Sequence, residues 1–503
     1  MESQDTVSYS SAMSSEDNNH VNKPYLKKEL IYQIDNNGGP TYDRNQVTFE
    51  TIGISNNGKW ADYKNAFISI PVCVTLSRDA HHATAADGPN LINFKGSNTI
   101  LIDSLTVSYG NDSIIQQNSN INAFCTFKQH TEFSINDALI NDYTGYRVDS
   151  ANWTYTAVSG LVNNTFTDYP CKTQSADEAL ILTNANVLDS GENYYSFDAA
   201  TNTHVYRYDC IIRLKDLLFF EKMPLVRGGN VKITLNLNQS STITHYNAGV
   251  VSTSVNTLKG SSNFVLRSNE GITGGVAYDE TITLKVVTNN GHQTKKSECR
   301  LYVPVYIMSP KSEALYLEQG VKTIIYSDLF VKMEKGLTGD FQRLLTNSLS
   351  RMKRLVIVPM LSQHTAGGVD HCNPQEGLYS TEPATCSPYF LQNFNLQMSG
   401  SNIYSQSIDY KYESFLNEMN GVFGLNSNME TGSTSSLISM KQYNSNMGYI
   451  VVDLSRRFDY DENVPLSISI QGKISSPKAL DFLCFIEYEK TIKINLLTGA
   501  KEQ

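Results

Sequence analysis

Histidine, cysteine and carboxylate side chains gather at two places where they could bind a metal ion. The first group consists of His364, His371, Cys372 and Cys386. Imidazole and thiolate groups are ligands of tetrahedral zinc, but the spacing is irregular and includes no Cys-x-x-Cys pair. The second group, Asp459-Tyr460-Asp461-Glu462, offers the oxygen ligands that calcium prefers, without the spacing of an EF-hand loop. We expect both groups to be solvated loops, and zinc and calcium sites remain the alternatives.

Residues for acid–base or nucleophilic catalysis do not form a recognisable set. The adjacent pair His81-His82 could supply a general base, yet sequence position ties no nucleophile or carboxylate to it. The motifs GxxxxGK[ST], GxGxxG, HExxH and GxSxG, which mark nucleotide-binding proteins, zinc proteases and serine hydrolases, are absent. A β-sandwich glycosidase needs only two carboxylates placed by the fold, so that class stays open. The sequence favours an interaction or structural protein without a catalytic site or cofactor.

The cysteines are typical of reduced, buried thiols. They are dispersed along the chain without the short spacings of a disulfide scaffold. Cys73 and Cys484 lie inside apolar runs, where cysteine behaves as a small hydrophobic residue. The eight cysteines are Cys73, Cys125, Cys171, Cys210, Cys299, Cys372, Cys386 and Cys484.

Charge and hydropathy exclude other classes of protein. Charged residues make up 18% of the 503, the net charge is −10, and no long basic block occurs, so tight binding to a phosphate backbone is not expected. Residues 1–23 lack the basic start and apolar segment of a secretory signal, and no run of about 18 apolar residues predicts a membrane span. We therefore expect synthesis in a reducing cytosol.

Short runs of alternating or apolar residues predict an all-β chain with long loops. In Val231–Leu237, for example, every second residue is apolar. The length suits two large β units better than one. We predict a flexible arm over residues 1–45, which carries a charge of −3, a first β module over 46–260 and a second over 261–503, with the boundary between modules near 240–280.

Two helices are expected in the second module. In Phe341–Arg354, the residues Phe341, Leu345, Leu349 and Met352 fall at helical spacing, with Asp340 as the N-cap. The basic residues Arg351, Lys353 and Arg354 would then lie at its C-terminal end, on a solvated face or against nucleic acid. In Asp409–Met419, the residues Tyr412, Phe415, Leu416 and Met419 predict a helix that packs on the core and ends at Gly421.

Two segments resemble the major capsid proteins of polinton-like viruses, adintoviruses and virophages. The first is Asp103–Gln117, DSLTVSYGNDSIIQQ, a strand, a turn rich in Tyr and Asn, and a β-branched pair followed by Gln. The second is Pro388–Gly400, PYFLQNFNLQMSG, continued by Ile403–Gln406 and by Tyr410, Glu413, Phe415 and Leu416. The tail, with Asp453–Arg456 and Ile468–Gly472, is similar as well, so that the resemblance covers roughly residues 45–495.

This resemblance implies a double jelly roll, with two eight-stranded sandwiches, a few short helices and long loops. It also implies homotrimeric, pseudo-hexagonal capsomers of the hexon type that tile an icosahedral virion shell around double-stranded DNA, next to penton and minor capsid proteins. Some relatives carry a basic N-terminal arm that meets the genome. The arm of this chain is acidic, so we expect it to tie to neighbouring capsomers or minor proteins instead.

Two other functions fit part of the pattern. A β-sandwich protein that binds or cleaves glycans would use aromatic loop residues such as Trp153, which lies in the sequon Asn152-Trp153-Thr154. A minor shell or spike protein of the same kind of virus is a third hypothesis, but two tandem jelly rolls argue against it.

Overall fold

The computed structural model describes the chain in many short segments. Statements about its structure concern these residues: 25–36, 42, 46–55, 58–78, 91–94, 97–110, 113–133, 195–198, 200–201, 203–238, 241–246, 257–259, 264–267, 278–361, 391–424, 438, 440, 443, 447–455, 464–475 and 479–502. They form mostly antiparallel β-sheets with few helices, which confirms the predicted fold class.

The first module is a sandwich of two four-stranded sheets with an extension. One sheet has the order β1-β17-β4-β9, and the facing sheet has the order β2-β10-β6-β7. Numbered along the chain from one to eight, these strands follow the orders 1-8-3-6 and 2-7-4-5, which is a jelly roll. The eight strands are β1 (Tyr25–Ile34), β2 (Gln46–Glu50), β4 (Phe67–Arg78), β6 (Ile102–Tyr109), β7 (Ser113–Ser119), β9 (Thr203–Arg213), β10 (Val231–Leu237) and β17 (Arg300–Met308).

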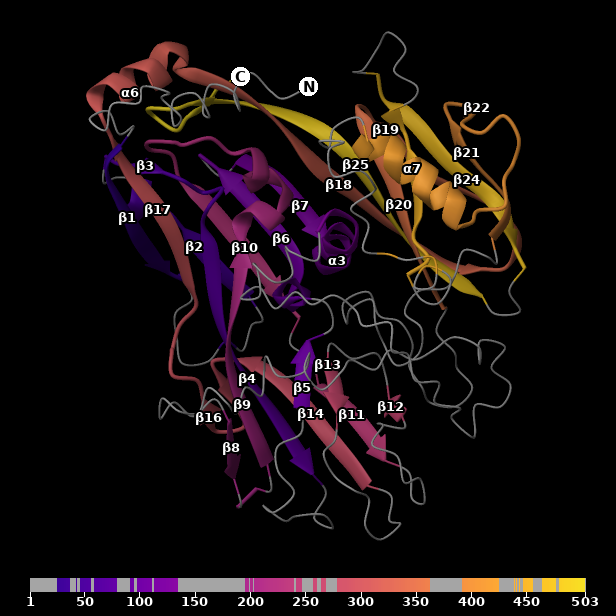
Figure 1. Cartoon of the computed structure of the whole chain (residues 1–503), viewed down its shortest axis with the longest axis horizontal. Coiled ribbons are helices and arrows are strands. Elements are labelled where there is room, and N and C mark those ends of the chain that lie inside the picture. Colours follow the sequence, from indigo (N-terminus) through magenta and orange to yellow (C-terminus); the bar gives the residue numbers. More distant parts are fainter. Residues whose placement is uncertain are drawn as a thin grey trace.

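Further strands lengthen this module at one end. β14 pairs with β4 beyond the end of β17, and β11 and β12 continue the sheet outward (Figure 1). β8 pairs with β9, β3 pairs with β17, and two separate ribbons pair β5 with β13 and β15 with β16. The bounds are β3 (Trp60–Ala61), β5 (Leu91–Phe94), β8 (Tyr195–Asp198), β11 (Ser241–Tyr246), β12 (Thr257–Lys259), β13 (Phe264–Arg267), β14 (Tyr278–Val286), β15 (Thr288–Asn289) and β16 (His292–Gln293).

The second module repeats the same strand order. Its sheets are β18-β25-β20-β23 and β19-β24-β21-β22, again 1-8-3-6 and 2-7-4-5 along the chain. A short strand, β26, pairs with the end of β25. The bounds are β18 (Val321–Leu337), β19 (Gly339–Leu349), β20 (Met352–Leu361), β21 (Leu391–Met398), β22 (Ser401–Asn402), β23 (Ile450–Asp453), β24 (Leu466–Ile474), β25 (Leu480–Asn495) and β26 (Lys501–Glu502).

Short helices close and connect the sandwiches. α3 lies between the two modules, α6 follows β17, and α7 packs on β23 (Figure 1). Buried apolar residues of both modules form one continuous cluster. The helices are α2 (Ile52–Ser55), α3 (Ile121–Glu132), α6 (Pro310–Tyr316) and α7 (Tyr412–Gly424), and the 3-10 turns are η3 (Asn98–Leu101), η6 (Leu214–Asp216), η7 (Leu218–Lys222) and η8 (Leu317–Gln319).

The division of the chain by strand pairing differs from the predicted one at both boundaries. β1 lies within residues 1–45, yet it pairs with β17 along its whole length. β14 and β17 lie beyond residue 260, yet both pair with β4, and they stand out as salmon strands in an indigo and magenta module (Figure 1). We therefore propose that the second module begins near Val321, because the eighth strand of the first jelly roll closes only at Met308.

The helix predicted over Phe341–Arg354 is wrong, because these residues form β19 and β20. Phe341, Leu345 and Leu349 are buried four residues apart, which fits a helix face and also fits one side of a strand. The pairing of β19 with β24 shifts register twice, between Leu344 and Thr346 and between Thr346 and Leu349. These bulges interrupt the alternation that would have distinguished a strand from a helix. Asp340 is therefore no N-cap.

The second predicted helix is confirmed. α7 contains the predicted apolar face, and Phe415 and Met419 are buried in the core. It runs past Gly421, so this glycine is not its C-terminal cap. Ser399 and Gly400, at the end of the segment that resembles capsid proteins, form the turn between β21 and β22, and both have positive φ.

Candidate functional site: the junction of the two sandwiches and the open edge of β1

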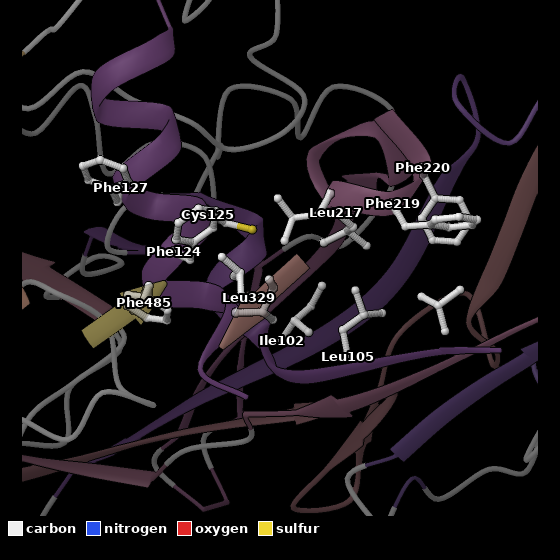
Figure 2. Packing of buried hydrophobic residues seen from close by; sticks show 14 of the residues in the cluster. Ile102, Leu105, Phe124, Cys125, Phe127, Leu217, Phe219, Phe220, Leu329 and Phe485 are labelled. Atoms are coloured by element: carbon white, nitrogen blue, oxygen red, sulfur yellow. The ribbon is translucent and has the colours of Figure 1, made fainter. Parts of the chain in front are cut away.

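The apolar contact between the modules centres on α3. Ten of its twelve residues are buried, although it belongs to the first sandwich. The ring of Phe124 lies 5.5 Å from that of Phe485 on β25, and the ring of Phe127 lies 5.1 Å from that of Tyr449. Figure 2 shows Phe124 beside Phe485 and Leu329, both of the second sandwich. Since aromatic pairs at such distances add packing energy to buried area, α3 fixes the modules to each other.

A cluster of charged side chains, the junction ion cluster, lies at the same contact. Arg354 of β20 donates from Nε to Glu487 of β25 at 2.5 Å and from a terminal nitrogen to Glu132 of α3 at 3.4 Å. Lys128 of α3 lies 3.5 Å from Glu132 and 3.3 Å from Glu221 of η7. The cluster therefore joins α3 and η7 of the first module to β20 and β25 of the second.

The environment of the junction ion cluster stabilises its charges. The Arg354 guanidinium lies over the rings of Phe124 and Phe127, 5.7 and 5.4 Å from their centroids, and 3% of its side chain is exposed. Burial alone would raise the pKa of Glu487, but the positive charges of Arg354, Lys128 and Lys353 and a hydrogen bond from Ser327 together outweigh it and lower that pKa to about 2. Burial works against the charged form of Lys128 too, yet Glu132 and Glu221 raise its pKa above the ordinary value. Glu487 and Lys128 therefore remain ionised at neutral pH.

A second buried carboxylate, Asp328 of β18, completes the junction. Asn118 of β7 donates to it at 2.9 Å and to the Leu329 carbonyl at 3.1 Å. Tyr488 donates at 3.1 Å, and Lys490 of β25 forms an ion pair with it. Because buried polar groups are costly unless they are hydrogen-bonded, this set favours one relative placement of β7 and β18.

Two glycine backbones press together where the end of the chain reaches the first module. A Cβ on Gly229 would lie 2.8 Å from Cα of Gly499 and 2.8 Å from the Tyr109 hydroxyl. Arg227 N–H donates to the Leu496 carbonyl at 2.8 Å, next to this contact. Only residues without a side chain fit here, so the last turn of the second module is held against the loop before β10.

The outward face of β1, an edge strand, carries a row of exposed side chains that are apolar except for Lys28. Leu26, Lys28, Leu30, Tyr32 and Ile34, hereafter the β1 stripe, point away from the core, because the residues between them pair with the buried Leu301, Val303 and Val305 of β17. Within the described ranges, no strand other than β17 pairs with β1. An open edge beside an apolar face is typical of an interaction surface.

The described residues offer little for catalysis. A cavity of about 190 Å³ beside α3 is lined by Lys64, Lys128 and Lys215 and by Glu132, Asp216 and Glu221, so its charges balance. Cys125 also lines it, but burial raises the pKa of this thiol to about 12, which leaves it protonated and a poor nucleophile. The five described cysteines, Cys73, Cys125, Cys210, Cys299 and Cys484, are free and buried, as predicted for Cys73 and Cys484.

The residues predicted as possible ligands lie outside the described ranges. This holds for His81 and His82, for His364, His371, Cys372 and Cys386, and for Asp459, Tyr460, Asp461 and Glu462. Among the residues that the structure does describe, no three histidine, cysteine or acidic side chains are close enough to hold a metal ion, and no helix is long and apolar enough to cross a membrane.

Sequence reasoning missed the charged residues of the junction. Arg351, Lys353 and Arg354 were expected on the end of a helix, but Arg354 is buried and paired, while Lys353 forms an exposed pair with Glu489 at 2.7 Å. A signal was present, because Arg354 directly precedes the apolar run Leu355–Val358 and Glu487 directly follows Phe482–Ile486. A charge at the border of a buried strand is a candidate for a buried pair.

The strand order defines the chain as two tandem jelly rolls joined by one buried junction. No family model matches the sequence, and no curated protein matches it. Several solved structures are similar, and three of them are named here. They are the mavirus major capsid protein (TM-score 0.49, 10% identity, 97% of this chain and 92% of that chain), PBCV-1 VP54 fitted into a reconstruction of the virophage Sputnik (0.45, 11%, 97% and 99%), and the Faustovirus major capsid protein (0.43, 10%, 94% and 92%).

Proposed function

We propose that this chain is a major capsid protein that self-assembles into homotrimeric capsomers and then into an icosahedral virion shell around double-stranded DNA. The observation that carries the proposal is the repeated strand order, 1-8-3-6 over 2-7-4-5, in two sandwiches fixed by a buried junction. Three copies around a three-fold axis present six similar sandwiches, and a unit with six similar sides can tile a layer.

The nature of the described contacts supports a structural role. Arg354 and Asp328 hold the second module against Glu132 and Asn118 of the first, and the cavity beside α3 combines balanced charge with a protonated thiol. These groups stabilise a rigid building block and supply neither an activated nucleophile nor a cofactor pocket. These contacts therefore support a structural role, like that of the capsid proteins with a similar fold.

The finer parts of the proposal concern partners and location. Capsomers would contact one another and the penton and minor capsid proteins, after synthesis in the host cytoplasm. The net charge of −10 favours contacts with proteins over direct binding to the genome.

No observation on the described residues specifically supports the glycan-binding alternative. Of the two tryptophans, Trp60 is buried against Tyr316, with ring centroids 5.4 Å apart, and Trp153 lies outside the described residues. A glycan site needs exposed aromatic rings that stack on sugars, and the buried ring of Trp60 cannot do this.

The mass of the purified protein tests the proposal. We expect size-exclusion chromatography with light scattering to give a species near three times the chain mass of 56.1 kDa, or larger shells. Negative-stain images of the same fraction should show hexagonal outlines. A monomer at all concentrations, with binding on a glycan array, would contradict self-assembly and move the weight to the glycan-binding alternative.

A further inference from the structure

The exposure of the β1 stripe is unusual for a strand that belongs to a core sheet. The exposed fractions are 70% for Leu26, 55% for Leu30, 51% for Tyr32 and 39% for Ile34. These four are large apolar side chains on one face of one strand, with exposed Lys28 among them. Proteins usually protect an open edge with charges, bulges or a covering segment. β1 has a register shift between Tyr25 and Lys27 and charges at Lys27, Lys28 and Glu29, but it pairs regularly from Lys27 to Ile34 and is uncharged from Leu30 onward. This part of the edge predicts pairing with another strand.

The charges around β1 do not oppose such pairing. Glu29 lies on the other face and forms ion pairs with both Lys27 and Lys59. The Lys28 ammonium lies over the ring of Tyr306, 5.4 Å from its centroid, and Arg300 lies over the ring of Tyr32 at 5.0 Å. Aromatic rings already hold the cations of this face, and another ring from a partner strand can do the same.

We propose that β1 of one chain pairs antiparallel with β1 of a second copy, around a two-fold axis at Leu30. This inference rests on the proposed self-assembly and names the surface through which capsomers join. The two sheets then continue into each other across the contact, and the two β1 stripes form one apolar face.

The sequence of β1 is complementary to itself in this register. Leu30 faces Leu30 of the second copy, Lys28 faces Tyr32, and Leu26 faces Ile34, so the whole stripe is paired. Directly opposed side chains in antiparallel strands interact most strongly, and by symmetry they form three apolar pairs and two cation–π pairs here. A shift of the register centre to Glu29 would oppose two carboxylates, and a centre at Lys28 would oppose two ammonium groups.

A two-fold contact at β1 is compatible with a trimer. Each trimer would carry three β1 edges, and each edge would meet the β1 edge of a neighbouring trimer. Three-fold units joined by two-fold contacts extend into a layer, whereas a head-to-tail contact between unlike surfaces closes a ring or forms a filament. The corresponding edge strand of the second sandwich, β18, exposes only Val321 and Ile325 among its large apolar residues, which makes a shorter stripe.

Disulfide cross-linking tests this pairing. Directly opposed residues in antiparallel strands have Cα atoms about 4.5–5.5 Å apart, within the range that a disulfide spans. The full-length variant Leu30→Cys, oxidised after assembly, should give a covalent dimer on a non-reducing gel at least five-fold above the wild type. The variants Glu29→Cys and Ile31→Cys test the neighbouring registers and should cross-link at the wild-type level.

A charged variant distinguishes failure of the β1 pairing from failure of self-assembly. Leu30→Lys places two positive charges at the two-fold axis, and we expect trimers of unchanged mass that no longer form shells. Assembled shells without a Leu30→Cys cross-link, or with stronger cross-linking at Glu29→Cys or Ile31→Cys, would overturn the β1 pairing and leave self-assembly standing. Cross-linked dimers without any trimer would support the β1 pairing and contradict the proposed homotrimeric capsomer.

Discussion

Arg354 and Glu487 show how two charged residues can belong to a core. Glu487 follows five apolar residues of β25, and Arg354 precedes four apolar residues of β20, so both lie where a strand leaves the interior. Their mutual contact, the two phenylalanine rings and Glu132 replace the water that each charge loses. A buried pair of this kind favours one arrangement of the elements that carry it, because each partner is costly when it is left alone.

Removal of Arg354 should therefore destabilise the protein strongly. We expect Arg354→Met to lower the free energy of unfolding by about 3–5 kcal/mol, because Glu487 would stay buried without its partner. The double variant Arg354→Met/Glu487→Leu should recover most of this loss. Urea denaturation followed by tryptophan and tyrosine fluorescence measures both, and equal losses in the single and double variants would contradict the explanation.

The same pair predicts a pH dependence. The pKa of Glu487 in the folded protein is lowered to about 2 from its ordinary 4.5, so the folded state binds its proton more weakly than the unfolded state does. Its contribution to stability is complete above about pH 4.5 and is lost as the pH falls toward 2. We expect the stability of Glu487→Gln to fall less steeply than that of the wild type over this range, as urea midpoints at several pH values would show.

A substitution at Phe415 tests whether the confirmed helix α7 packs on the core. Its side chain is fully buried, and its ring lies 5.0 Å from that of Tyr443. Phe415→Ala should cost about 3–5 kcal/mol, as removal of a buried aromatic side chain does. Asn417→Ala, on the exposed side of the same helix, is the matched control and should change the unfolding free energy by less than about 0.5 kcal/mol. A small effect of Phe415→Ala would show that α7 does not pack on the core.

At the scale of elements, sequence periodicity predicted isolated strands well and failed where a strand is irregular. Val231–Leu237 alternates strictly and forms β10 with the same bounds. Phe341, Leu345 and Leu349 are four residues apart, which fits a helix face and one side of a strand, and two bulges in β19 interrupt the alternation that would distinguish the two. A bulge is decided by the partner strand, so a single segment of sequence contains no direct sign of it.

The contact of two glycines provides a test at this scale. Gly229 has φ of +79° and meets Gly499, while Gly400 has φ of +81° with no atom within 4 Å of its missing Cβ. Gly400→Ala should cost only the backbone strain, about 1–2 kcal/mol. Gly229→Ala should cost about 1–3 kcal/mol more, because the new methyl group displaces the last turn of the chain. Equal costs in thermal unfolding would mean that the two backbones do not touch.

At the scale of the molecule, the fold class followed from the sequence, but the division into modules did not. The two predicted β modules are both jelly rolls, with the strand order repeated in each. The predicted boundary near 240–280 falls inside the extension of the first jelly roll, because β11 to β16 lie between its seventh and eighth strands. Which strand completes a sheet depends on pairing between distant residues, and local pattern does not encode it.

The junction between the modules could not be predicted from the sequence for the same reason. Asn118 and Asp328 are 210 residues apart, and Arg354 and Glu487 are 133 apart, so neither pair is a spacing motif. The groups that sequence did single out, such as His364 and His371, attracted notice because they are close in sequence. Local spacing finds sites within one loop, whereas a contact between modules is assembled from strands that only the fold brings together.

The pairing of β1 with β17 also determines when the first strand can fold during synthesis. Tyr25 pairs with Met308 and Ile34 with Arg300, so the first strand waits for a partner that is made more than 260 residues later. At synthesis rates of about 5–20 residues per second, that interval is roughly 15–50 s. During it, both edges of β1 and its apolar stripe are exposed on a nascent chain. Many copies translated from one message would therefore expose the same apolar strand to one another until translation passes residue 308.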